Sequence, residues 1–494
     1  MSKISHLKPF HTILVCCILS ITPFLSLLFH IPEYVDFIGI ILIALIVIYN
    51  FKSWNKKWKI ATSVIAISSI TWLLWGSVCW PLWNSEFLSS NLTKSFEYTN
   101  SPDHRICKKD AIIDLEFAYK NICKNHPALI DSIPKSLDDA FHFAHKQIEA
   151  QDSISVISLY AIIQTMTATL HDGHTMVFPR FQTFHQINLG QYGKLLSVNN
   201  ISLDDIFEHN KHLYSSETDD FSHFLMNNNL SIYEYLPLFN FDINNGIIYS
   251  FINNGDTIDK KFFKEDFFTN EYEQPNIKSQ TNISNFSIVD SLDYGYFDIH
   301  HFECFLPGKM RLVKNDISTF FDSVSQHNIN NVIFDVRYNT GGNPRIWYYI
   351  INHLSDKKRI YYGKGWLRCG PFKIKYKLGF NNAKNAKQPY KGNVYLLTST
   401  LSFSASMEFA NCLQENNLGK IVGLSPGNTP NCYTSIFVYC LPKSKLRIQV
   451  SNHEHIVNRP GIVNNRIVPD YECPSEEALK QVLNIIKEQN PSKE

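Results

Sequence analysis

Three short segments of the sequence carry residue types that together could hydrolyse an acyl bond. His174 ends a Leu-His-Asp-Gly-His sequence, and an imidazole is a proton acceptor near neutral pH. Gly341 and Gly342 follow a predicted strand, where adjacent glycines let backbone N–H groups point at an oxyanion or a phosphate. Ser404 precedes a predicted helix, whose N-terminal N–H groups and dipole stabilise developing negative charge.

Each segment also has an ordinary structural explanation. A Gly-Gly pair after a strand is common in turns, and a serine before a helix is a frequent N-cap. His174 by itself could be a structural or surface histidine. His171 and Asp172 beside it could suggest a metal site, but no matching ligand cluster occurs elsewhere. Solvated side chains explain His453 and His455 better, so we expect no metal or cofactor.

Several motifs resemble one family in the correct order. Asp335 to Gly342 resembles D-L-R-x-N-x-G-G, and Leu397 to Ala410 resembles L-T-S-x-x-T-F-S-A-A-E-E-F-A, of the tail-specific or C-terminal processing serine peptidases, family forty-one of that class. Leu170 to Thr175 resembles L-x-D-G-H-T of the branch related to the tricorn core protease. Tyr294 to Phe302 and Cys440 to Asp470 resemble its G-Y-I-x-I-x-x-F strand and its L-P-N-S-G to G-I-x-P-D ending. The resemblance covers roughly residues 110 to 485.

The resemblance implies an α/β catalytic core of the crotonase-like (ClpP/crotonase) type and a serine endopeptidase that cuts polypeptides through an acyl-enzyme. Ser404 would be the nucleophile. Because a serine hydroxyl is a poor nucleophile at its ordinary pKa, a neighbouring base must accept its proton. The tricorn-like branch takes this base from the D-G-H-T motif, which His174 matches.

The resemblance leaves the third member of a triad open. Asp470 matches the family's P-D pair, Glu454 is a second acid in the terminal region, and the acid could also be absent. The oxyanion hole would use backbone N–H groups, either that of Gly341 or that of Gly342, together with that of Ala405.

Departures from the family pattern keep two alternative functions open. Another branch of the family uses a lysine as the base, and the corresponding stretch here, Gly423 to Cys432, contains no lysine. The same stretch replaces the family's usual G-E-x-T-G-G. Met407 stands at a position where the family commonly has an acid. A catalytically degenerate member would bind or sense peptides. An esterase or other acyl hydrolase on the same scaffold would differ in the shape of its pocket.

Periodicity predicts the elements that position these segments. A helical pattern runs from Asp110 to Thr169, and residues 185–285 alternate short apolar runs with Asn-rich turns, as short strands and hairpins do. In this segment Val198 to Ile206 resembles a turn of the family's PDZ module, so a degenerate PDZ-like segment is expected. After about Phe286, strands and helices alternate, which indicates βαβ units whose sites lie at the carboxyl ends of strands. The expected strands are Gly295–Ile299, Asn331–Val336 and Asn393–Thr398, and the expected helices are Met310–Ser325, Pro344–Leu354 and Ala405–Asn416.

The N-terminal part of the sequence is predicted to be a membrane anchor. Apolar runs at Ile13–Ile31, Phe37–Tyr49 and Ile60–Trp83 predict about three transmembrane helices, the second being the shortest. Lysines before the first run and between the last two predict a cytoplasmic N-terminus and an extracytoplasmic, periplasmic or extracellular, catalytic part of a multi-pass membrane protein. The alternative is a signal peptide followed by a hydrophobic core helix, but no A-x-A-like cleavage site is present.

These patterns divide the chain into an anchor (1–85), a helical region ending in the His174 motif (86–184), a β-rich segment (185–285) and the α/β core (286–494). The chain has 494 residues, 44% of them hydrophobic, and a formal charge of +1, which argues against a nucleic-acid partner. The expected partner is a polypeptide substrate. Cys107 with Cys123 and Cys432 with Cys440 are possible disulfides, and buried free thiols are the alternative.

Overall fold

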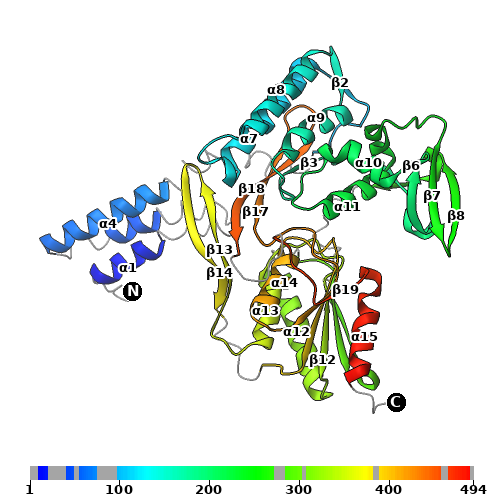
Figure 1. Cartoon of the computed structure of the whole chain (residues 1–494). Helices are drawn as coiled ribbons and strands as arrows, with labels where there is room; N and C mark the ends of the chain where they lie inside the picture. Colours follow the sequence, from blue (N-terminus) through cyan, green and yellow to red (C-terminus); the bar gives the residue numbers. More distant parts are fainter. Residues whose placement is uncertain are drawn as a thin grey trace. The chain divides into compact units, whose positions relative to one another are not determined.

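The computed structural model describes residues 9–19, 41–48, 55–74, 97–271, 284–302, 307–381, 389–457 and 465–489 (Figure 1). The chain forms two compact units, Met1–Ser95 and Phe96–Glu494. The motifs identified above all lie in the second unit.

The first unit contains α1 (Pro9–Leu19) and α4 (Lys56–Leu74), with Cys16, Ile43 and Ala66 in a small buried cluster. Among the described residues, no helix combines the length and the apolar character that crossing a bilayer requires. The 11 residues of α1 are too few, and α4 begins with Lys56 and Lys57. The prediction of three spans, with the membrane-embedded N-terminus and the multi-pass location derived from it, is therefore wrong. The rest of the three predicted spans lies outside the described residues.

The helical pattern after Asp110 corresponds to three helices at the start of the second unit. They are α7 (Lys108–Asn125), α8 (Lys135–Glu149) and α9 (Val156–Ala168), with the short strands β1 (Arg105–Cys107) and β2 (Ser153–Ser155) pairing beside them. The Ser155 hydroxyl caps α9 by accepting a hydrogen bond from the Ser158 N–H. The segment with His174 follows α9 directly and leads into β3 (Met176–Phe178).

The middle of the second unit is rich in strands, as its Asn-rich turns predict. A four-stranded sheet has the order β6-β5-β7-β8, and a separate pair joins β4 to β9. Asn254 and Gly255, both with positive φ, form the two-residue turn between β7 and β8. The strands are β4 (Thr183–Gln186), β5 (Lys194–Val198), β6 (Ile201–Ser202), β7 (Ile247–Asn253), β8 (Asp256–Phe262) and β9 (Phe268–Glu271), and the helices are α10 (Leu203–Asn210) and α11 (Asp219–Leu230).

A six-stranded sheet forms the centre of the α/β core, in the order β10-β11-β12-β15-β16-β19. The edge strand β10 is antiparallel to β11, and the other neighbours are parallel. The strands are β10 (Ser284–Val289), β11 (Tyr294–Ile299), β12 (Asn331–Asp335), β15 (Asn393–Thr398), β16 (Lys420–Gly423) and β19 (Tyr471–Glu472). The prediction of an α/β core is confirmed, and β15 has the predicted bounds.

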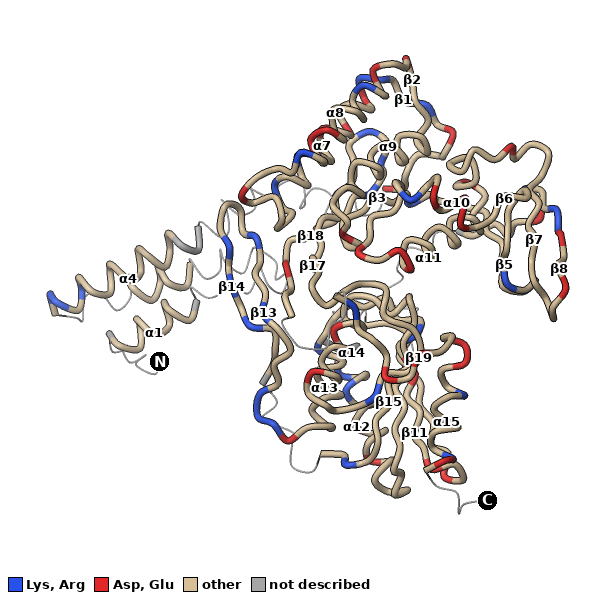
Figure 2. Tube along the Cα trace, in the orientation of Figure 1, with Lys and Arg blue, Asp and Glu red and all other residues tan. Residues whose placement is uncertain are grey.

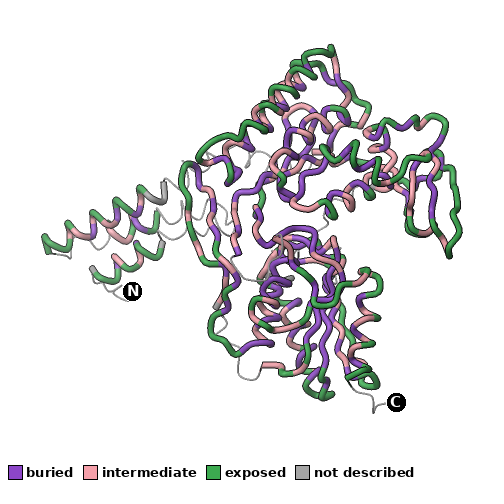
Figure 3. Tube along the Cα trace, in the orientation of Figure 1, coloured by how far each residue is buried: buried purple, intermediate pink, exposed green. Residues whose placement is uncertain are grey.

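Helices cover both faces of this sheet. Val332 and Phe334 of β12 face a core shared with α12 (Pro307–Gln326), α13 (Arg345–Leu354) and α14 (Ala405–Glu415). Ile333 faces the other side, where α15 (Ala478–Gln489) packs. This alternation explains why the three central residues of β12 are all apolar, since both faces of the strand are buried (Figure 3).

A second sheet connects the helical region to the α/β core. Its order is β14-β13-β18-β17, and β3 pairs with β18 through Ile448 and Val177. The strands are β13 (Arg359–Cys369), β14 (Phe372–Asn381), β17 (Cys432–Cys440) and β18 (Arg447–Ile456). The pairing of β3 with β18 fixes the segment that carries His174 to the C-terminal part of the chain.

Four cysteines considered as disulfide partners are free thiols. Cys107 and Cys123 form no disulfide with each other. Cys432 and Cys440 are buried at the two ends of β17. The alternative of buried free thiols therefore describes the second pair.

Replacing Trp347 tests the core beneath the site. The indole is fully buried, with its ring 5.9 Å from that of Phe409 and 5.3 Å from that of Tyr362. We expect Trp347→Ala to lower the free energy of unfolding by about 3–5 kcal/mol, because the cavity cannot refill completely. Urea denaturation measures the change. Leu312→Ala, on the exposed side of α12, is the control and should cost less than about 0.5 kcal/mol. Equal losses in the two variants would contradict the packing described here.

Candidate active site

Two turns at the carboxyl ends of β12 and β15 are joined by hydrogen bonds. The two strands are parallel neighbours, with Asp335 opposite Leu397. The Phe403 N–H donates to the Asn339 carbonyl oxygen at 3.2 Å, and the Ser402 hydroxyl donates to the Val336 carbonyl oxygen at 2.8 Å. These bonds bring the Gly-Gly turn and the Ser404 turn into contact.

Ser404 has a strained backbone conformation at the start of α14. Its φ of 53° and ψ of −116° lie in a region that L-residues rarely adopt, at a cost of about 1–3 kcal/mol. The Ser404 N–H donates to Asn428 Oδ1 at 2.7 Å, and the Ser404 carbonyl oxygen accepts from the Glu408 N–H at 2.9 Å. A strained serine in a turn from strand to helix is the geometry of a nucleophile elbow.

The Gly-Gly turn approaches Ser404 very closely. A Cβ on Gly341 would lie 2.7 Å from the Ser404 Cβ and 3.0 Å from the Ala405 nitrogen, and its φ of +104° also favours glycine. The Gly341 N–H is already donated to Asn339 Oδ1 at 2.9 Å. By contrast, the N–H groups of Gly342 and Ala405 donate no hydrogen bond within the described part of the chain. Gly342 is exposed, whereas Ala405 is the first residue of α14.

His174 lies against the residue that precedes Ser404. The His174 ring is 4.7 Å from the Phe403 ring, centroid to centroid, and Phe403 also stacks on Phe221. His174 is only 6% exposed, and neither ring nitrogen has a hydrogen-bond partner among the described residues. The structure therefore brings His174 and the Ser404 turn together without a hydrogen bond between His174 and the Ser404 hydroxyl.

Asp172 organises the segment that carries His174. Its Oδ1 accepts the His174 backbone N–H at 2.9 Å, and its Oδ2 accepts the hydroxyls of Thr175 at 2.5 Å and Ser451 at 2.7 Å. The same Oδ2 lies 3.1 Å from Nε2 of His126, which is also fully buried. Burial alone would raise the pKa of Asp172, but the hydrogen bond and charge of His126 lower this pKa to about 2. Asp172 is consequently an anion at neutral pH.

The charge of Asp172 acts on His174 at short range. His174 Nδ1 is 4.0 Å from Asp172 Oδ1. Burial lowers the pKa of His174, and the negative charge of Asp172 opposes part of this effect. His174 is therefore a neutral imidazole at pH 7, able to accept a proton.

Glu217 supplies a second acid beside His174. Its Oε2 accepts the Gly173 N–H at 3.3 Å, and its buried Oε1 has no hydrogen-bond partner within the described residues. Burial and the neighbouring charge of Asp172 raise the pKa of Glu217 to about 8. Glu217 therefore keeps its proton at pH 7.

Asp172, His174 and Glu217 also form a group that could be considered for a metal ion, since one ligand atom of each lies within 4.8 Å of the others. Asp172 fits this role poorly, because donors from the protein already occupy both of its oxygens. The arrangement instead suits a group that holds and moves a proton.

The two acids favoured by sequence lie in other contacts. Asp470 accepts a hydrogen bond from Lys420 Nζ at 2.8 Å and another from the Ile421 N–H at 2.9 Å, at the edge of the six-stranded sheet. Glu454 on β18 accepts a hydrogen bond from Trp366 Nε1. The carboxylates of Asp172 and Glu217 lie beside His174, and the charge of Glu408 also raises the pKa of His174.

A sequence comparison identifies the family of the α/β core. The sequence model described as peptidase family S41 matches residues 293–473. The α/β core, within residues 293–473, therefore belongs to peptidase family S41. It is a serine-type peptidase, and its motifs at Gly341 and Ser404 lie within the matched residues, whereas His174 lies before them. No curated protein matches the chain.

Two CPAF structures share the fold of this chain at low sequence identity. Mature CPAF complexed with lactacystin is 12% identical, with a TM-score of 0.54 over 78% of this chain and 99% of that one. A CPAF mutant is 13% identical, with a TM-score of 0.55 over 77% of this chain and 96% of that one. The photosystem II D1 C-terminal processing protease is 11% identical, with a TM-score of 0.43 over 76% of this chain and 97% of that one. The CPAF structures extend the likeness in fold well beyond the residues that the family model matches.

Sequence reasoning missed three residues of the candidate site. Asn428, which binds the Ser404 N–H, lies in the stretch that departs from the family's G-E-x-T-G-G. His126 and Glu217 come from segments far from His174 in the sequence, without any motif of their own.

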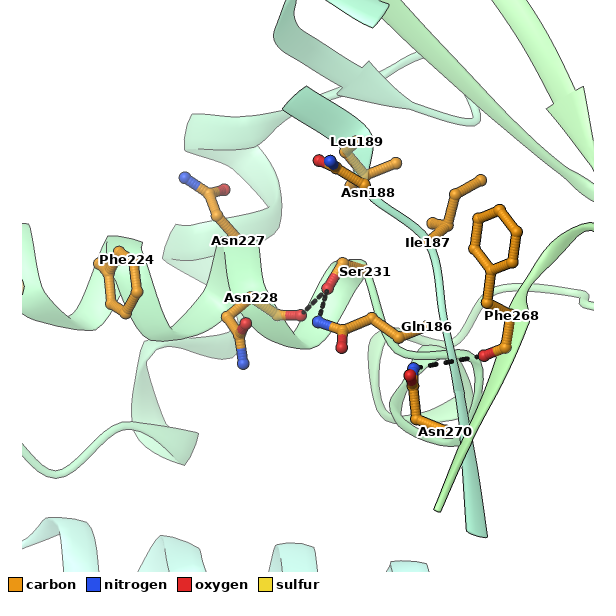
Figure 4. Close-up of a pocket in the computed structure, with 10 residues that line it drawn as sticks. All are labelled: Gln186, Ile187, Asn188, Leu189, Phe224, Asn227, Asn228, Ser231, Phe268 and Asn270. Carbon is orange, nitrogen blue, oxygen red and sulfur yellow. Dashed lines mark hydrogen bonds between the residues drawn. The ribbon is translucent and has the colours of Figure 1, made fainter. Parts of the chain in front are cut away.

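A cavity of about 530 Å³ lies elsewhere in the peptidase, in its β-rich middle. Figure 4 shows its amide side chains, among them Gln186, whose Nε2 donates to the Ser231 hydroxyl at 3.2 Å. Neither Ser404 nor His174 lines this cavity, so it is separate from the candidate active site.

Glu217→Gln tests the protonation of the cluster. Because folding raises the pKa of Glu217 from 4.5 to about 8, its contribution to stability is complete below pH 4.5 and is lost as the pH rises through 8. We expect the wild type to lose stability relative to Glu217→Gln between pH 5 and pH 8, by at most about 1.4 kcal/mol per pH unit. Urea denaturation of both proteins at several pH values measures this difference. The exposed Glu116→Gln is the control, and parallel curves for Glu217→Gln and the wild type would contradict the raised pKa.

Proposed function

We propose that this S41 peptidase is an endopeptidase in which Ser404 attacks the scissile carbonyl carbon and His174 accepts the hydroxyl proton. The serine oxygen forms a bond to that carbon, and the carbonyl oxygen becomes an oxyanion. His174 then gives the proton to the departing amine, which leaves an ester between Ser404 and the acyl part of the substrate. Water, deprotonated by His174, hydrolyses this ester and restores the serine.

The strained backbone of Ser404 is the observation that carries the proposal. A serine that only capped α14 would not need this conformation, and its side chain accepts no capping hydrogen bond within the described residues. The strain is held by Asn428 and by the bond between Phe403 and Asn339. Strain of this kind is typical of sites where the backbone must present one side chain to a substrate.

The N–H groups of Gly342 and Ala405 fit the oxyanion hole. Gly342 lies in the Gly-Gly turn and Ala405 in the Ser404 turn, and these two turns meet at Ser404. Neither N–H donates a hydrogen bond within the described part of the chain. Gly341, the other candidate from the sequence, has its N–H bound to Asn339. Its role in the proposal is to allow the close approach of the turn, which any side chain would prevent.

His174 is neutral at pH 7 and so can accept the proton of Ser404. The hydrogen bond between the two side chains would form when the substrate binds, as catalytic hydrogen bonds often tighten in the complex. In place of Asp470, we assign Asp172 as the positioning residue. It holds the His174 backbone and lies close enough to stabilise the imidazolium that forms in the transition state.

Ser404→Ala is expected to abolish hydrolysis of an unfolded polypeptide and labelling by a fluorophosphonate probe, because no other group in the proposal forms the acyl bond. His174→Gln should lower kcat by at least about 10³-fold. Chromatographic detection of new peptide termini measures the cleavage. Ser435→Ala, on a partly exposed strand, is the matched control. Cleavage by Ser404→Ala at the wild-type rate would disprove the assignment.

Asp172→Asn and Asp470→Asn distinguish the two candidate acids. We expect Asp172→Asn to lower kcat by about 10²–10³-fold, the loss of a unit charge 4.0 Å from His174 in a medium of intermediate polarity. It should also move the acid limb of the kcat/KM profile to lower pH, because Asp172 raises the pKa of His174. Asp470→Asn should change kcat less than about threefold. The reverse order of effects would restore Asp470 as the catalytic acid, and circular dichroism of both variants controls for folding.

A further inference from the structure

Positive charge is concentrated in one segment of this nearly neutral chain. Residues 357–381 hold eight Lys and Arg and no Asp or Glu, whereas the net charge of the whole chain is +1. Six of the eight lie on β13 and β14, where Figure 2 shows blue segments along both strands. The eight residues are Lys357, Lys358, Arg359, Lys364, Arg368, Lys373, Lys375 and Lys377.

The register of the hairpin places most of this charge on one face. Lys364 lies opposite Lys377, Trp366 opposite Lys375, and Arg368 opposite Lys373. These six residues, which are five basic residues and Trp366, form what we call the basic face. The three lysines of β14 and Lys364 are exposed, while the alternate residues Leu367 and Leu378 are buried on the other face.

The charges of the basic face are only partly compensated. Lys373 Nζ pairs with Asp131 at 2.5 Å, and Glu454 of the neighbouring strand β18 binds Trp366. No ion pair involves Lys364, Lys375 or Lys377 within the described residues. Because like charges directly opposite each other on two strands destabilise the pairing, an anionic partner would relieve a repulsion that the hairpin maintains.

The strand β14 is also the edge of its sheet. It is the last strand in the order β14-β13-β18-β17, and no other described strand pairs with its outer side. Lysines on an edge prevent non-specific pairing with other sheets. An extended segment with carboxylates at every second residue would overcome this barrier, because its side chains repeat with the same period as Lys373, Lys375 and Lys377.

The hairpin is fixed to the helix that begins at Ser404. Asn411 of α14 and Asn416, the residue that caps the C-terminus of α14, donate side-chain hydrogen bonds to β13. Their acceptors are the Tyr362 and Tyr361 carbonyl oxygens, at 3.2 and 3.3 Å. His455 of β18, the strand paired with β13, lies 2.9 Å from Glu408 of α14. A polypeptide bound on the basic face would therefore be held on elements that directly contact the nucleophile helix.

We propose that the basic face is an exosite, which binds an extended acidic segment of a polypeptide substrate by adding it as a strand to β14. Glu or Asp side chains at alternate positions of that segment would pair with the lysines of the face. As a statement about substrates, this rests on the proposed peptidase function. The binding itself requires no catalysis.

The cleavage experiment uses two peptides with the same cleaved sequence, flanked on both sides by alternating Glu-Thr or by alternating Gln-Thr residues. We expect the wild type to have a KM about tenfold lower for the Glu-Thr peptide at low ionic strength, and the difference to disappear at about 0.5 M salt. The triple variant Lys364→Gln, Lys375→Gln, Lys377→Gln should lose this preference and cleave the Gln-Thr peptide within about twofold of the wild-type rate.

The control variant carries the same change of net charge at other exposed lysines, Lys135→Gln, Lys146→Gln and Lys480→Gln. It should keep the preference for the Glu-Thr peptide. Equal cleavage of the two peptides by the wild type would overturn the exosite and leave the peptidase function supported. Preference in the basic-face variant equal to that of the control variant would also overturn it.

The binding experiment separates the exosite from catalysis. A fluorescent Glu-Thr peptide without the cleaved sequence is titrated against Ser404→Ala, with anisotropy as the readout. Binding that the three basic-face substitutions weaken about tenfold would support the exosite even if the wild type cleaved no peptide. Tighter binding of the same face to vesicles of phosphatidylcholine and phosphatidylserine, or to single-stranded DNA, would overturn the assignment to an acidic polypeptide.

Discussion

The hydrogen bond from the Phe403 N–H to the Asn339 carbonyl oxygen joins the two turns on which the rest of the site depends. It fixes the residue before Ser404 to the turn that carries Gly341, so the strained serine and the glycine approach each other closely. The same Phe403 supports the ring of His174. A displacement of this one contact would thus move the proposed nucleophile, oxyanion hole and base together.

Parallel strands made the core of the site predictable from the sequence. Apolar runs such as Asn393–Thr398 are buried on both faces, so their bounds and the helices after them follow from hydrophobicity alone. The turns at the carboxyl ends of such strands must meet at one edge of the sheet, and Ser404 and Gly341 do so. The bond that Asn428 makes to Ser404 was not predictable, because it depends on the path of an irregular loop without periodicity.

The acids near His174 and the membrane segments show the limits of pattern reasoning. The P-D pair suggested Asp470, but a motif does not reveal which atoms its carboxylate reaches, and here Lys420 and Ile421 bind it. Glu217 reaches His174 from a loop that no local signal connects to that motif. In the first unit, a high content of apolar residues did not establish helices of spanning length. The lysines at the start of α4 belong to the helix itself, whereas the prediction placed them in a connection between helices.

The pairing of β3 with β18 has a consequence for the order in which the protein is made. Ser451 of β18 donates hydrogen bonds to Asp172 and Thr175, and this strand is synthesised after both His174 and Ser404. A growing chain in which β18 has not yet been synthesised lacks the contacts that hold Asp172 and Thr175, the neighbours of His174. The proposed catalytic arrangement is therefore complete only after β18 has been synthesised and has paired with β3.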